Sequence, residues 1–200
     1  MSKSEISEEN VSIVIPAYNS ARTIGNVIKS LINQRYVNLE IIIVDDNSKD
    51  STLDVIKELK GKFPNSNIKI FKNTENKGLS RSIREGLKRA SYLYFGIVHD
   101  DIYFPKNDLI YTGLSFLKKK DIACVSFLYF MPKEIFDKCN FWGKIYSNID
   151  FRMENKITKI KEPIIGYDIA AGKAIIFKNI IIDELNLYND KRLKYGGEDV

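Results

Sequence analysis

The sequence predicts an α/β fold in which helices cover both faces of a mainly parallel central sheet. First, strand-like and helix-like segments alternate along residues 11–98 with short connections between them. Second, the apolar run at residues 41–44 is unbroken, as in strands that are covered on both faces. Third, apolar residues between the strands recur at a spacing of three and four, which is the period of a helix.

The first half of the chain supplies four strands and three helices. The strands are expected at residues 11–15, where Pro16 ends the run, and at 41–44, 68–71 and 92–98. Ser20 is expected to cap the first helix, and Asp50 or Ser51 the second, which Gly61 should end. The apolar faces of the three helices are Ile24, Val27, Ile28, Leu31 and Ile32, then Leu53, Ile56 and Leu59, and then Leu79, Ile83 and Leu87.

The second half is less regular. After Pro105 a helix is expected with an apolar face of Leu109, Ile110, Leu114 and Leu117, followed by a strand at 122–129 and another at 174–177. Residues 131–165 show no clear period. We expect residues 1–10 to be a disordered lead-in and 11–200 to form one domain with two halves, at about 11–105 and about 106–200.

Composition excludes several classes of protein. His99 is the only histidine, and Cys124 and Cys139 are the only cysteines, so a structural zinc site, a Ser-His-Asp triad and a disulfide framework are not expected. The net charge of +5 is modest and indicates a solvated surface rather than a nucleic-acid partner. The two cysteines favour a reduced cytosolic compartment, so we expect a cytoplasmic location. The polar, acidic N-terminus is not a signal peptide, and no apolar run is long enough to span a membrane.

Polar residues follow three of the predicted strands, at the edge where α/β sheets bind ligands. The three groups are Pro16, Ala17, Tyr18 and Asn19; Asp45, Asp46, Asn47 and Ser48; and His99, Asp100 and Asp101. Adjacent carboxylates repel each other, and Mg²⁺ or Mn²⁺ with substrate phosphates would relieve that repulsion at Asp100 and Asp101. The alternative is that acids at strand ends only form turns or caps, and it has most weight for Asp101.

The other candidates also have two interpretations. Asp45 and Asp46 suit a turn, but one of them could accept hydrogen bonds from a nucleobase or ribose. Tyr18 could stack on a base or simply pack. The segment 76–81, with Gly78 and Arg81, opens a helix whose free N–H groups and cations could meet phosphate, or could form only a cap.

Four motifs in order, VSIVIPAYNS, IIIVDDNSKDST, NKGLSRSIREGLKRA and HDDIYFP, resemble the inverting family 2 glycosyltransferases of the GT-A fold. The resemblance runs from Val11 to Asp199 and implies a nucleotide-diphospho-sugar donor and a divalent metal. It makes residues 11–105 the approximate donor-binding half of the domain and residues 106–200 the acceptor-side half. It assigns Tyr18 and Asp46 to the base, Asp100 to the metal, and Pro16, Ala17 and Asn19 to the donor pocket. In the family's Asp-x-Asp motif, His99 takes the middle position and Val98 replaces the first acid.

The end of the chain resembles the acceptor side of the same family. The segment 170–177, which contains Gly172, resembles the acceptor-side loop and strand. Residues 196–199, with Gly197 and Glu198, resemble the motif whose Asp, here Asp199, is the general base. The third motif departs from the family because Ile83 and Arg84 replace its usual Arg-Asn pair, so Arg81 or Arg84 would have to supply the donor contact.

Because the sequence stops one residue after Asp199, we expect it to be a fragment of a longer protein with weak or no transfer activity. The resemblance leaves the acceptor open between a glycan and a lipid-linked or polyprenyl-phosphate acceptor, and so allows peripheral membrane association at the inner face. It also leaves the donor sugar, the base and the oligomeric state open.

Three other functions were weighed against sugar transfer. A nucleotide-sugar-binding module without turnover shares every donor-site residue and differs only in whether Asp199 works. A signalling receiver would need the acid pair after the first strand, whereas Asp45 and Asp46 follow the second. Nucleotidyl transfer would need a basic, glycine-rich loop after the first strand, and residues 17–20 do not form one.

Overall fold

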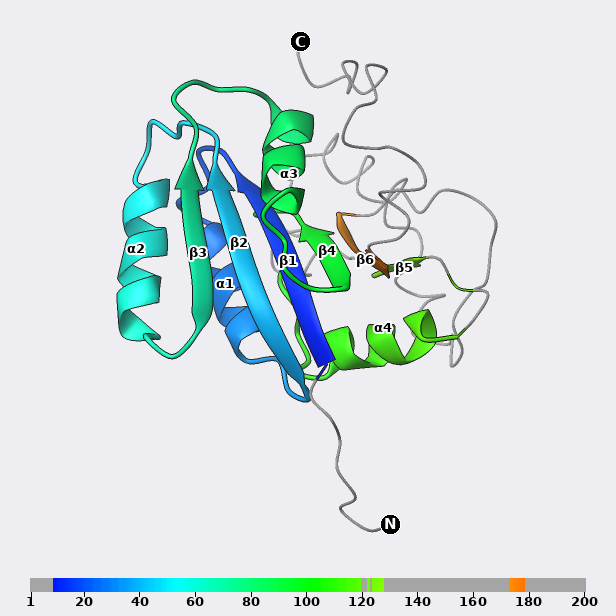
Figure 1. The fold of residues 1–200 in the computed structure, drawn as a ribbon. Coiled ribbons are helices and arrows are strands. Elements are labelled where there is room, and N and C mark those ends of the chain that lie inside the picture. Colours follow the sequence, from blue (N-terminus) through cyan, green and yellow to red (C-terminus); the bar gives the residue numbers. More distant parts are fainter. Residues whose placement is uncertain (1–8, 120–121, 123, 128–172, 179–200) are drawn as a thin grey trace, which may run out of the picture.

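The computed structural model of the protein describes residues 9–119, 122, 124–127 and 173–178 (Figure 1). Within these residues six strands form one sheet in the order β3-β2-β1-β4-β6-β5. The strands are β1 (Glu9–Ala17), β2 (Val37–Asp45), β3 (Asn67–Lys72), β4 (Tyr94–Val98), β5 (Cys124–Ser126) and β6 (Ala174–Lys178). The strands β3, β2, β1 and β4 run parallel, and β6 is antiparallel to β4 and β5. The predicted mainly parallel sheet is confirmed.

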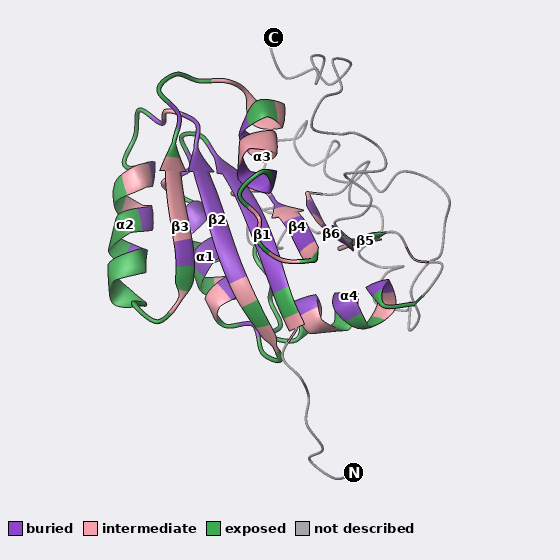
Figure 2. Cartoon of the chain, in the orientation of Figure 1, coloured by how far each residue is buried: buried purple, intermediate pink, exposed green. Residues whose placement is uncertain are grey.

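Helices cover both faces of the sheet, as predicted. They are α1 (Ile24–Ile32), α2 (Thr52–Lys62), α3 (Leu79–Leu87) and α4 (Leu109–Leu117). The apolar sides of α1, α2 and α4 join one core cluster, whereas Leu87 of α3 packs on the other face with Val14, Ile42 and Phe95. Figure 2 shows that β1 and β2 are buried along most of their length, as the apolar runs at residues 11–15 and 41–44 predict.

A glycine allows α3 to lie very close to β1. Gly86 is buried, and a Cβ atom added there would lie 2.3 Å from Cγ1 of Val14. This close approach sets the position of α3 over the sheet, and the chain enters α3 from the loop that follows β3 (Figure 1). The first turn of α3 therefore lies at the edge where the parallel strands end.

Several boundaries differ from those predicted. β1 and β2 are longer, because the backbone ladder between them continues from Glu9 and Val37 through Pro16 to Ala17 and Asp45. Ser20 does not cap α1: the helix begins at Ile24 after Thr23. Gly61 does not end α2, which continues to Lys62. β4 begins at Tyr94 rather than at residue 92, and the described part of the predicted 122–129 strand is β5.

Part of the predicted organisation lies outside the described residues, namely most of the lead-in and the irregular segment 131–165. Within the described residues, no helix is both long and apolar enough to cross the hydrocarbon layer of a membrane.

A buried ionic cluster supports the sheet away from the edge where the strands end. The side chain of Glu40 is 1% exposed and forms an ion pair with Lys69 on β3. Its carboxylate also accepts hydrogen bonds from the Ser12 hydroxyl at 2.5 Å and from the N–H group of Ser91 at 2.9 Å. Burial alone would raise the pKa of Glu40, but hydrogen bonds from Lys69, Ser12 and Ser91 outweigh it and hold the pKa below its ordinary value.

Candidate functional site

The three strand ends that the sequence singled out lie side by side. β1 is the central neighbour of both β2 and β4, and all three run in the same direction (Figure 1). Ala17 at the end of β1 pairs with Asp45 at the end of β2, and the N–H group of Tyr18 donates to Oδ2 of Asp100 at 3.2 Å. We call this the carboxyl edge. The predicted convergence of polar residues at one edge of the sheet is confirmed.

The turn after β1 is fixed by the turn after β2. Asn19 has a φ of 51°, a left-handed conformation that asparagine tolerates well. Its N–H group donates to the Ser48 hydroxyl at 3.0 Å, and its side-chain oxygen accepts from the Lys49 N–H group at 2.8 Å. The Ser20 N–H group donates to the Thr52 hydroxyl at 2.7 Å. These contacts hold the backbone while the Tyr18 side chain stays 46% exposed above it.

Pro16 and Ala17, predicted for the donor pocket, are buried residues of β1 itself. They lie directly before the exposed Tyr18, so in this structure they belong to the buried end of β1 next to the carboxyl edge.

The two acids after β2 have different roles. Asp45 is fully buried, and its Oδ1 accepts from the Ser48 N–H group at 3.3 Å, which is the turn contact that the sequence allowed. Asp46 is 3% exposed and faces the segment that leads into α3. Its carboxylate accepts from the N–H groups of Lys77 at 2.9 Å and Gly78 at 2.8 Å. Asp46 therefore holds the loop before α3 in place.

Asn73 is a site residue that the sequence analysis did not identify. It follows β3 and is buried, and its Nδ2 donates to Oδ1 of Asp46 at 2.6 Å and to the Ser82 hydroxyl at 3.1 Å. The amide thus connects β2, β3 and α3 at the carboxyl edge. The signal that could have found it is a polar amide directly after a buried strand, close to a predicted helix start.

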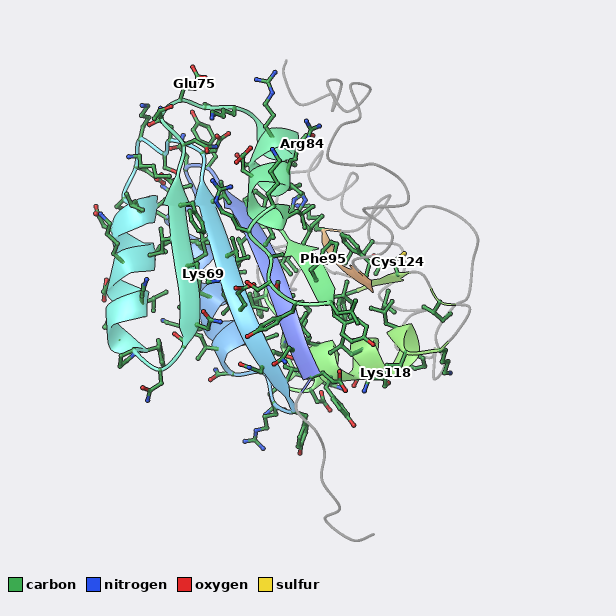
Figure 3. The ribbon with its side chains drawn as sticks, in the orientation of Figure 1. Lys69, Glu75, Arg84, Phe95, Lys118 and Cys124 are labelled. Carbon is green, nitrogen blue, oxygen red and sulfur yellow. The ribbon has the colours of Figure 1, made fainter. Side chains whose placement is uncertain are left out.

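Gly78 and Arg81 lie at the start of α3, as predicted. Gly78 has a φ of 81°, a conformation for which glycine is suited, and its N–H group also donates to Oδ1 of Asn76. Arg81 is exposed. Figure 3 places Arg84 further along α3, and its Nε atom is buried without a hydrogen-bond partner among the described residues.

Beyond β4, the acids occupy different environments. Asp100 is partly buried beside the β1 turn, whereas Asp101 is 43% exposed and forms an ion pair with Lys173 at 2.7 Å. Burial raises the pKa of Asp100 above its ordinary value, and the charge of Asp101 adds to the shift, whereas the hydrogen bond from Tyr18 opposes it. The N–H group of His99 donates to the backbone oxygen of Lys173 at 2.8 Å, which ties β4 to the start of β6.

The carboxylates of Asp100 and Asp101 fit Mg²⁺ or Mn²⁺ in the way that these ions bind with phosphates. Such ions prefer hard oxygen ligands and often take only one or two carboxylates, with the remaining ligands from water and substrate. Among the described residues, no group of three or more His, Cys, Asp or Glu side chains could hold a metal ion. The two acids would therefore need a diphosphate to complete the coordination.

Two cavities lie away from the carboxyl edge. One has a volume of about 570 Å³ and lies between the end of α1 and the segment before α4, beside Arg35 and Lys106. The other, of about 420 Å³, lies between the ends of α1 and α2 and the start of β2 and β3. Neither is lined by a predicted site residue.

The predicted catalytic base and acceptor-side residues lie outside the described residues. These are Asp199, Gly172, Gly197 and Glu198. Their roles stay predictions.

Comparison with known proteins agrees with this geometry. The model of the glycosyl transferase family 2 matches residues 12–181. An uncharacterized glycosyltransferase of Haemophilus influenzae is 32% identical over 93% of the chain and 55% of its own length. A dolichol-phosphate mannosyltransferase of Pyrococcus furiosus is 28% identical over 78% of the chain and 45% of its own length. The chain thus spans about half the length of these curated relatives.

Solved structures of glycosyltransferases share the GT-A fold with this chain. The mannosyltransferase PcManGT of Pyrobaculum calidifontis, in complex with GDP-Man and Mn²⁺, has a TM-score of 0.66 at 19% identity, covering 90% of this chain and 47% of its own. S. aureus TarS 1–349, in complex with UDP, has a TM-score of 0.64 at 19% identity, covering 94% and 52%. The predicted fold is confirmed.

Proposed function

Because the chain belongs to the glycosyl transferase family 2, we propose that it binds a nucleotide-diphospho-sugar at the carboxyl edge and transfers the sugar with inversion. The observation that carries this proposal is the convergence of Tyr18, Asp46 and Asp100, which come from three strands, at one edge of the sheet. It supports the proposal because an aromatic ring, a buried carboxylate and an acid pair lie near one another, and a base, a metal ion and a diphosphate would each need such groups.

The base end of the donor belongs to Tyr18 and Asp46. The exposed ring of Tyr18 offers a face on which a base can stack. The Asp46 carboxylate has about four acceptor positions, of which three are used by Asn73, Lys77 and Gly78. The remaining position suits the ring N–H group of uracil or guanine. The bound UDP and GDP-Man of the structural relatives agree with either base.

The diphosphate end belongs to Asp100 and Asp101. With Mg²⁺ or Mn²⁺ bound, the ion would neutralise negative charge on the departing diphosphate. The role of the two carboxylates is to hold the metal ion next to the end of β4. The first turn of α3 and the side chain of Arg84 offer further donors to phosphate oxygens.

On the acceptor side, Asp199 removes the proton from the acceptor hydroxyl as the hydroxyl oxygen attacks the anomeric carbon. Gly172, Gly197 and Glu198 shape the acceptor side. The acceptor is a glycan or a lipid-linked or polyprenyl phosphate, and a lipid acceptor would bring the protein to a membrane surface. The alternative function is a nucleotide-sugar-binding module in which Asp199 does not act as a general base and no sugar is transferred.

Calorimetric titration with UDP and with GDP, each with and without Mn²⁺, tests the proposal. We expect one of the two nucleotides to bind only with the metal. Asp100→Ala should weaken that binding by at least about tenfold, because it removes a ligand from the ion. Asp54→Ala, an exposed acid on α2, is the matched control and should bind like the wild type. The proposal is wrong if neither nucleotide binds, or if Asp100→Ala binds as tightly as the control.

A further inference from the structure

Lys173 lies against the acid pair, although nothing in the motifs assigns it a role. Its ammonium group is 2.7 Å from Oδ2 of Asp101, and its backbone oxygen accepts the His99 N–H group. The next residue, Ala174, pairs with Val98 in the antiparallel ladder between β6 and β4. The sheet therefore holds the backbone of Lys173 next to the end of β4, and its long side chain reaches Asp101 from the start of the neighbouring strand β6.

The ion pair between Lys173 and Asp101 can be exchanged for another partner at little cost. The two side chains of the ion pair are 41% and 43% exposed. An exposed ion pair of this kind contributes little to stability, because water screens it and two side chains must be ordered to form it. A divalent ion has twice the charge of an ammonium group and would attract the same carboxylate more strongly.

The same side chain suits a second partner. A lysine ammonium is a compact point charge on a flexible stem and is a common ligand of phosphate oxygens. A diphosphate held by an ion at Asp100 and Asp101 would bring phosphate oxygens close to the position that Lys173 now occupies. Rotation of the side chain about its stem would then exchange a carboxylate partner for a phosphate partner without movement of the sheet.

We propose that Lys173 is a stand-in cation that exchanges partners: it neutralises Asp101 while the site is empty, and it binds the diphosphate when nucleotide and metal arrive. This inference rests on the proposed function. It adds a positive charge from the acceptor-side strand to the leaving group of the transfer. It also predicts that Lys173 lowers the affinity for the metal ion alone and raises the affinity for nucleotide in the presence of the metal ion.

The test is Lys173→Met, which keeps the length of the side chain and removes its charge. Mn²⁺ alone, measured by the electron paramagnetic resonance signal of free Mn²⁺, should bind up to about fivefold more tightly, because its competitor is gone. UDP or GDP in the presence of saturating Mn²⁺, measured by calorimetry, should bind at least about tenfold more weakly, because a charge-assisted contact to phosphate is lost. Lys173→Arg should keep nucleotide affinity within a few-fold of the wild type.

Lys118→Met is the matched control. Lys118 is also about half-exposed and ion-paired, with Glu9, but Figure 3 shows it at the end of α4, far from the carboxyl edge. The affinities of Lys118→Met for Mn²⁺ alone and for nucleotide with Mn²⁺ should both equal those of the wild type. If Lys173→Met does not fold, Lys173→Gln serves the same comparison.

The outcomes separate this inference from the proposed function. A wild-type protein that binds no nucleotide overturns both. If the wild type binds nucleotide but Lys173→Met changes neither the Mn²⁺ affinity nor the nucleotide affinity, or lowers both, only the partner exchange is overturned. Tighter Mn²⁺ binding together with weaker nucleotide binding supports it.

Discussion

Replacing Asn73 by alanine should destabilise the protein more than its small size suggests. The substitution removes an amide that donates to two buried groups, Oδ1 of Asp46 at 2.6 Å and the hydroxyl of Ser82 at 3.1 Å. A hydrogen bond to a charged group contributes about 1.5–3 kcal/mol and a neutral one about 0.5–1.5 kcal/mol. Because both partners stay buried, we expect the free energy of unfolding to fall by about 2–4 kcal/mol.

Urea unfolding of the wild type and Asn73→Ala at neutral pH measures this loss. The slope of the free energy against urea should stay the same, because the surface exposed on unfolding does not change. Asn76→Ala is the control: it removes the same type of side chain from the same loop, but its contact with the Gly78 N–H group is exposed. That control should cost less than about 1 kcal/mol. A loss in Asn73→Ala no larger than in the control would refute the idea that the amide connects the three elements.

Two further predictions concern the rest of the fold. Gly61→Ala should stabilise by about 0.5–1 kcal/mol, because nothing lies within 4 Å of the new methyl group and alanine favours the helix. Gly86→Ala should destabilise the protein by about 1–2 kcal/mol, although alanine favours this helix too, because the methyl group would lie 2.3 Å from Val14. Equal changes in the midpoint of thermal unfolding for the two glycine variants would contradict this. Since the pKa of Glu40 is lowered on folding, its ionised form stabilises the protein above pH 4.5. The difference in unfolding free energy between wild type and Glu40→Gln should therefore shrink as the pH falls below 4.5, and a constant difference would contradict the assignment.

The core and the edge of the sheet could be predicted from the sequence because their signals are local. The apolar runs of β1 and β2 identify strands that helices cover, and the polar residues after them identify the edge where the strands end. The boundaries were less predictable. Residues such as Glu9 and Asn38 join β1 and β2 through backbone pairing, which needs no apolar side chain.

The partners within the site could not be predicted, because they are distant in the sequence. Asp46 was expected to face a base, but most of its acceptor positions are taken by residues 27 to 32 positions away. Lys173 is 72 positions from Asp101, and only the antiparallel return of β6 beside β4 brings them together. Glu40 lies directly before the predicted strand at 41–44, and its burial and its ion pair with Lys69 were not predicted.

Hydrogen–deuterium exchange with and without UDP or GDP and Mn²⁺ tests the central claim most directly, because it reports where the nucleotide binds. The account predicts slower exchange after β1, β2 and β4, at residues 17–19, 46–48 and 99–101, and at the start of α3. It predicts no change in residues 30–35 and 104–108 beside the 570 Å³ cavity. Protection confined to that cavity would contradict the assignment of the carboxyl edge as the nucleotide site.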